Sequence, residues 1–70
     1  MNIVRKYYWL SEMGDQRFFN FLQMKGIEVL LYEDSDTVVL DFNSEDQILW
    51  FEIGAKHFYK RTPEPFYTEG

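Results

Sequence analysis

The sequence predicts an α+β domain with a compact ferredoxin-like fold, in which two helices lie on one face of an antiparallel sheet. The first observation is the order of the segments, because strand-like and helix-like runs follow one another as β-α-β-β-α-β. The second is a polar loop over residues 33–36, which has the length of a hairpin connection. The third is the alternation within residues 37–42, where apolar side chains occupy every second position from Val38 to Phe42.

The first part of the chain contains three strand segments and one helix. β-branched and aromatic residues predict strands over residues 3–9, 27–32 and 37–42. The polar loop between the last two predicts that they pair antiparallel. Phe18, Phe21 and Leu22 recur at helical spacing, which predicts a helix over residues 15–25 that ends at the cap residue Gly26.

The segment after residue 43 decides the topology. Ser44 and Gln47 have the spacing of a capping box, and Gly54 stands where a helix of about nine residues would end. These signals favour a helix over residues 45–53. The apolar run 47–53 would also suit a strand, and in that case one helix would pack against a meander of strands.

The end of the chain is predicted to form the last strand and a tail. Residues 55–61 have strand-like composition and complete a single domain over residues 1–61. Two prolines indicate an extended tail over residues 62–70, since proline continues neither a helix nor a central strand. Phe66 and Tyr67 then belong either to a disordered end or to a peg that folds back over the open face of the sheet.

The aromatic content predicts a binding protein. Phenylalanine, tyrosine and tryptophan make up 20% of the 70 residues. The interior of so small a domain cannot enclose all of these rings, so some should lie on the surface. Exposed aromatic clusters usually mark places where a partner docks.

The sequence offers little for catalysis or metal binding, and we expect no enzyme, no metal and no cofactor. It has no cysteine and a single histidine, His57. The serines stand at predicted turns and caps, where they have a conformational use, and the four glycines are scattered rather than gathered in a phosphate loop. The acidic loop lacks the ligand spacing of a calcium site, because Val38 and Val39 occupy positions that should be polar.

The charge points to a basic protein partner. The net charge of −5 disfavours nucleic acid, whose binding depends on neutralising phosphates. Neither a membrane span nor a secretion signal is indicated, so we expect a cytoplasmic location. The size, acidity and absence of catalytic groups are typical of small accessory or inhibitor proteins, including those that phages and other mobile elements use against a larger host machine.

These observations predict a small acidic module that docks on a larger protein with a basic surface and either inhibits or recruits it. The predicted aromatic anchors are Tyr7, Trp9, Tyr32 and Trp50. The predicted steering charges are Glu33, Asp34 and Asp36, which would otherwise form a plain solvated hairpin tip.

Two alternatives remain at this point. A homodimer could cover the bare face of the sheet, which would make the protein a structural homo-oligomer. A single-stranded RNA reader could instead use Tyr7, Trp9 and a further tyrosine, Tyr8. Its basic residues would come from neighbouring first and last strands, namely Arg5, Lys6, Lys56, Lys60 and Arg61.

Overall fold

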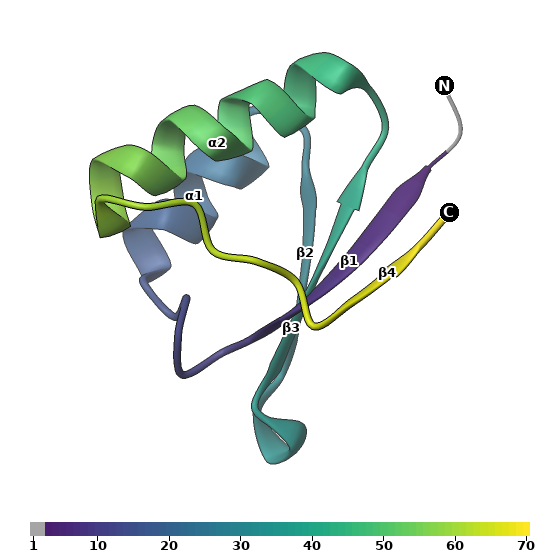
Figure 1. Cartoon of the computed structure of the whole chain (residues 1–70), viewed down its shortest axis with the longest axis vertical. Helices are drawn as coiled ribbons and strands as arrows, with labels where there is room; N and C mark the ends of the chain where they lie inside the picture. The colour runs from purple at the N-terminus through teal and green to yellow at the C-terminus, as the bar shows by residue number, and fades with distance from the viewer. Residues whose placement is uncertain (1–2) are drawn as a thin grey trace.

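The structure, a computed structural model that describes residues 3–70, has the predicted ferredoxin-like fold with two helices and a four-stranded antiparallel sheet. The elements are β1 (Val4–Trp9), α1 (Gln16–Met24), β2 (Glu28–Tyr32), a short 3-10 turn η1 (Glu33–Ser35), β3 (Thr37–Phe42), α2 (Glu45–Tyr59) and β4 (Tyr67–Glu69). The strand order is β2-β3-β1-β4, so β2 and β4 are the edge strands. Both helices lie on the same face of the sheet (Figure 1).

The core lies between the helices and the sheet. Val38, Leu40 and Phe42 of β3 are fully buried there, as the alternation in the sequence predicts. The ring of Phe51 from α2 lies 5.6 Å from that of Phe42 and 5.4 Å from that of Tyr8. Burial of these large rings gives a small domain without disulfides much of its stability.

Helix α2 begins where the sequence predicts and continues six residues beyond the predicted end, from residue 53 to Tyr59. Ser44 Oγ accepts a hydrogen bond from the Gln47 amide at 3.3 Å, and Gln47 Oε1 accepts one from the Asn43 amide at 2.6 Å. The predicted stop at Gly54 is wrong. Gly54 is buried within the helix, where a Cβ atom would stand 2.7 Å from the ring of Phe21. This glycine serves the close approach of α1 and α2.

The predicted strand over residues 55–61 is also wrong, because most of that segment is helical. The helix ends instead at Lys60, which adopts the left-handed conformation at φ 61°. The last strand comes from the segment predicted as a tail, since β4 pairs antiparallel with β1 and places Tyr67 opposite Tyr7. Phe66 precedes β4, and its amide donates to the Tyr7 carbonyl at 2.8 Å.

Three of the five basic residues predicted to lie on paired strands belong to the helical layer instead. Lys56, Lys60 and Arg61 lie on α2 or directly after it, and not on a strand beside β1. Arg5 and Lys6 lie on β1, so the five basic residues do not form the predicted strand pair. Within residues 3–70, no helix is both long and apolar enough to cross a membrane.

Candidate functional site

The face of the sheet turned away from the helices, here called the open face, is built from three rows of side chains that cross the strands. Antiparallel pairing places directly opposite residues on the same face, so the strand register defines each row. The charged row contains Glu28, Asp41, Arg5 and Glu69. The middle row contains Leu30, Val39, Tyr7 and Tyr67. The third row contains Tyr32, Thr37 and Trp9.

Aromatic side chains dominate the middle and third rows. The ring of Phe66 stacks on that of Trp9 with centroids 4.2 Å apart, and the ring of Tyr7 lies 5.4 Å from that of Tyr67. Together with Tyr32 these residues form what we call the aromatic band. Its members other than Tyr7 are between 43% and 56% exposed, so large apolar surfaces face outward.

β3, the strand that runs beneath the open face between β1 and β2, is buried on both of its sides. Val39 is 3% exposed and Thr37 is 9% exposed, although both point to the open face. The neighbouring side chains of β1 and β2 therefore close over β3. Ring contacts connect four members of the band, whereas Tyr32 lies on the far side of β3, opposite Thr37.

An ion pair between neighbouring strands β1 and β3 lies at one end of the open face, in the charged row. Arg5 donates to both carboxylate oxygens of Asp41, from Nε at 2.7 Å and from Nη2 at 2.9 Å. These hydrogen bonds, together with the positive charge, lower the pKa of Asp41 below its usual value, although burial opposes the shift. Beside this pair, the Tyr7 hydroxyl donates to Glu69, and that hydrogen bond raises the pKa of Tyr7.

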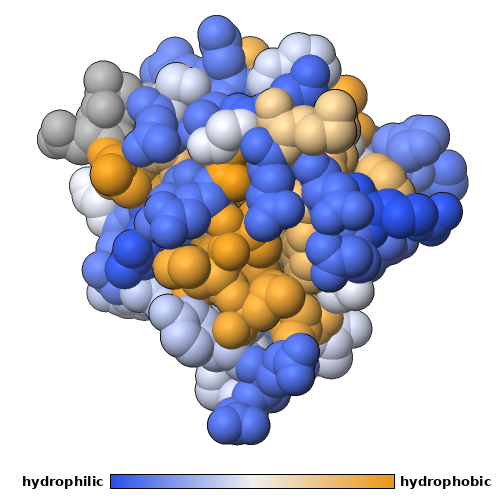
Figure 2. Space-filling model, turned by 180° about the vertical axis from the view of Figure 1, so that it is seen from behind, coloured by the Kyte–Doolittle hydropathy of each residue, from blue (hydrophilic) through white to orange (hydrophobic). Residues whose placement is uncertain are grey.

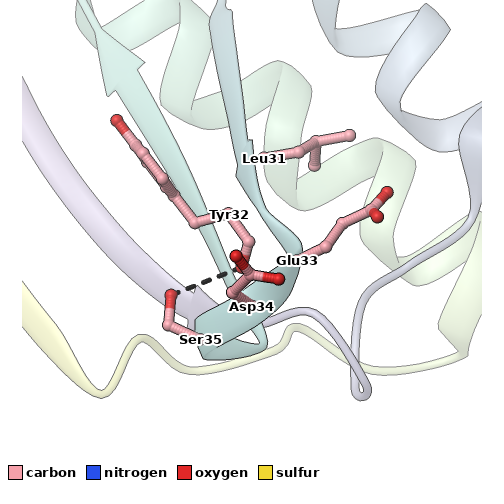
Figure 3. A pocket seen from close by; sticks show the side chains of 5 residues that line it. All are labelled: Leu31, Tyr32, Glu33, Asp34 and Ser35. Atoms are coloured by element: carbon pink, nitrogen blue, oxygen red, sulfur yellow. Dashed lines mark hydrogen bonds between the residues drawn. The ribbon is translucent and has the colours of Figure 1, made fainter.

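The β2–β3 hairpin forms the opposite end of the open face. It projects as the tip at the bottom of Figure 1, and the rear view also shows it as hydrophilic, below an apolar patch (Figure 2). Glu33 and Asp34 are exposed in η1. Ser35 Oγ donates to the Tyr32 carbonyl at 3.3 Å, which tightens the turn (Figure 3).

The three predicted steering charges are not equivalent. Glu33 and Asp34 line an open hollow of about 470 Å³ at the tip, where the Glu33 side chain points to the same side as Leu31 and away from the ring of Tyr32 (Figure 3). Asp36 has a structural role instead, because its carboxylate accepts from the Ser11 amide at 2.9 Å and from Ser11 Oγ at 2.7 Å. Asp36 also takes the left-handed conformation at φ 51°, which asparagine and aspartate tolerate better than most residues.

The predicted anchors divide between two surfaces. Tyr7, Trp9 and Tyr32 share the open face. Trp50 lies on α2, where its ring contacts that of Phe21 on α1. Two members of the band, Phe66 and Tyr67, were not among the predicted anchors. They form neither a disordered end nor a peg over the sheet, because Tyr67 belongs to the edge strand β4 and Phe66 directly precedes it.

The residues of the RNA alternative meet on the open face only in part, since Arg5, Tyr7 and Trp9 lie there and the others do not. Tyr8 points to the core and is 2% exposed, and burial raises its pKa. Lys56, Lys60 and Arg61 belong to the end of α2 in the helical layer. Among residues 3–70, Arg5 is the one cation in the three rows of the open face, and it is engaged by Asp41.

The part of the chain that the structure describes contains no group of three or more histidine or acidic side chains arranged to hold a metal ion. Comparisons with protein-family models, with curated proteins and with solved structures found no match to this chain.

Proposed function

We propose that this protein is a small binding module that docks, through its open face, on a basic and partly apolar surface of a larger protein and thereby inhibits or recruits it. The observation that carries the proposal is the aromatic band with carboxylates at both of its ends. Aromatic anchors supply most of the energy of protein interfaces, and charges around them set encounter rate and specificity.

The band suits a protein partner because its rings are exposed yet positioned in advance. Trp9 and Phe66 support each other by stacking, and Tyr7 is fixed by its hydrogen bond to Glu69. Side chains held in place lose little conformational entropy when a partner binds. An exposed band on a paired sheet is therefore a favourable anchor.

The charge of the open face defines the chemistry of the partner. One end carries the charged row, in which three carboxylates, Glu28, Asp41 and Glu69, stand beside Arg5. The other end carries Glu33 and Asp34 at the hairpin tip. A partner with lysine or arginine around an apolar centre would complement both ends, and the association rate should fall as salt rises.

The same charges disfavour the two alternatives. In a two-fold dimer formed by two open faces, acidic ends would meet acidic ends in either orientation, because both ends carry net negative charge. A nucleic acid would bring its phosphates against the same carboxylates. A protein with a basic surface meets neither obstacle.

The proposal is tested by affinity capture from a cell lysate, with and without nuclease. The capture uses the intact protein, a variant with Tyr32→Ser and Tyr67→Ser, and a control with Leu49→Ser. Leu49 is 55% exposed, comparable to the two tyrosines, but lies on α2. We expect one stoichiometric protein that survives nuclease, is retained by the control and is lost with the double variant.

Three results would count against this proposal. Equal capture by all three proteins would place the contact elsewhere. Recovery of nucleic acid alone, abolished when Lys60 and Arg61 are changed to glutamate, would favour the RNA alternative. A concentration-dependent dimer in sedimentation, lost in the double variant, would favour a structural homo-oligomer.

A further inference from the structure

A second apolar surface lies in the helical layer, in a groove between α1 and α2. The groove has a cavity of about 410 Å³ lined by Phe21, Ile53, Gly54, His57 and Phe58. Gly54 forms part of its floor, where the absence of a side chain lets α2 pack closely against the rings of α1. The groove shares no residue with the open face.

The wall on α2 is apolar and exposed. Trp50 is 40% exposed and Ile53 is 58% exposed, and His57 follows one turn later. This spacing of three and then four residues places the three side chains along one side of the helix. They extend for roughly two helical turns, or about 10 Å.

Two cations border the groove, one within α1 and one at the C-cap of that helix. Lys25 Nζ lies 3.8 Å from the centroid of the Trp50 ring and 5.7 Å from that of Phe21. The Arg17 guanidinium lies 5.6 Å from the centroid of Phe58 and also pairs with Asp15 at 3.1 Å. Lys25 forms no salt bridge with any residue in the described range 3–70. The groove thus combines an apolar floor with one bordering lysine outside any of these salt bridges, whereas the charge of Arg17 is matched by Asp15.

We infer that this groove binds an acidic amphipathic helix of a protein partner. Apolar side chains of the helix, spaced three and four residues apart, would enter the groove between Trp50 and His57. Its carboxylates would meet Lys25 and the outer side of Arg17, which gives the charge complementarity that selects an acidic ligand. The protein then carries two docking surfaces of opposite charge and could bridge two partners.

The test uses a helical peptide of roughly 15 residues with a leucine stripe and glutamates elsewhere. A matched peptide has lysine in place of each glutamate. Binding to the intact, isotope-labelled protein is followed by amide chemical shifts. We expect the acidic peptide to shift the amides of Phe21, Ile53 and His57, to leave those of Tyr7 and Tyr67 in place, and to bind more tightly than the basic peptide.

A matched pair of charge reversals identifies the contact. Lys25→Glu should weaken binding by roughly tenfold, because it removes the groove's free cation and adds repulsion. Lys56→Glu changes the net charge equally but lies on α2 outside the groove lining, so it should have little effect beyond general attraction. Thermal unfolding of both variants checks that each is folded.

Several results would overturn the inference. Equal binding of the two peptides, or equal loss in the two variants, would leave no selective acidic site. Shifts of the same amides on dilution of the protein alone would assign the groove to a second copy of the chain. Shifts caused by anionic phospholipid vesicles but not by the acidic peptide would assign it to a lipid surface. Each outcome is independent of the open face, so failure here leaves the proposed function intact.

Discussion

The rings of Trp9 and Phe66 lie stacked, with their centroids 4.2 Å apart and their planes 24° apart. Trp9 ends β1, whereas Phe66 stands directly before β4, so the contact joins segments that are far apart in the sequence. It joins the last segment of the chain to β1 at the edge of the sheet and completes the aromatic band. The stability of β4 and the shape of the proposed docking face therefore depend on the same pair of rings.

Removal of one ring should loosen the end of the chain. Phe66→Ala is expected to lower the free energy of unfolding by about 1 kcal/mol, the order of an aromatic pair at a partly exposed site. Amide hydrogen exchange should accelerate in β4 while the β1–β3 amides remain protected. Tyr67→Ala, a neighbouring exposed ring without the stack, is the comparison. Unchanged exchange in β4 of the Phe66 variant would show that the stack does not hold the strand.

The buried glycine of α2 should not tolerate even one added methyl group. Alanine is the better helix former by about 1 kcal/mol, but overpacking in a core typically costs about 1–3 kcal/mol. Because the new Cβ would stand 2.9 Å from the fully buried ring of Phe18, Gly54→Ala should lower the stability in urea unfolding. Glu52→Ala in the same helix should change it by less than about 0.5 kcal/mol. A stabilised Gly54→Ala variant would contradict this packing.

The end of α2 offers a stabilising substitution. Lys60 holds a left-handed conformation at φ 61°, which glycine adopts without steric cost. Lys60→Gly should therefore raise the free energy of unfolding by roughly 0.5–1 kcal/mol. Lys56→Gly, one turn earlier inside the helix, should lower it by about 1 kcal/mol. Effects of the same sign in the two variants would place the helix end elsewhere.

The ion pair between Arg5 and Asp41 on the open face should make the free energy of unfolding depend on pH. The folded pKa of Asp41 is lowered mainly by its hydrogen bonds to Arg5. Such a group contributes stability that is fully present above the unfolded pKa, about 3.9, and is lost as the pH falls through the lower folded value. Asp41→Asn should thus be less stable than the intact protein at neutral pH and lose less stability on acidification. Equal acid dependence in urea titrations would contradict the role of the pair.

The sequence alone predicted correctly the elements that are marked by local patterns. The capping box at Ser44 marked the start of α2, and the polar loop marked the hairpin after Tyr32. The end of α2 was missed because glycine at position 54 has two physical uses, as a helix stop and as a close-packing residue. Only the contact with Phe21 on another element decides between them.

The candidate site, too, was predictable only where local sequence patterns determine the position of a residue. Alternation along β1 places Tyr7 and Trp9 on one face, and the hairpin register adds Tyr32 to it. The place of Trp50 depends on how α2 packs on α1, which local periodicity did not determine. The contribution of Phe66 depends on the pairing of a three-residue strand that follows two prolines, a long-range contact with little local signal.

Site-specific photocrosslinking tests the central claim most directly. A photoreactive phenylalanine analogue replaces Tyr32 on the open face or, in the matched control, Asn20, which is exposed on α1. We predict that the probe at position 32 crosslinks to one protein, at a lysine- or arginine-rich surface found by mass spectrometry, with a yield that falls as salt rises. The probe at position 20 should not crosslink to that protein. Equal crosslinking from both positions, or from position 32 only to nucleic acid or to a second copy of the chain, would contradict the proposal.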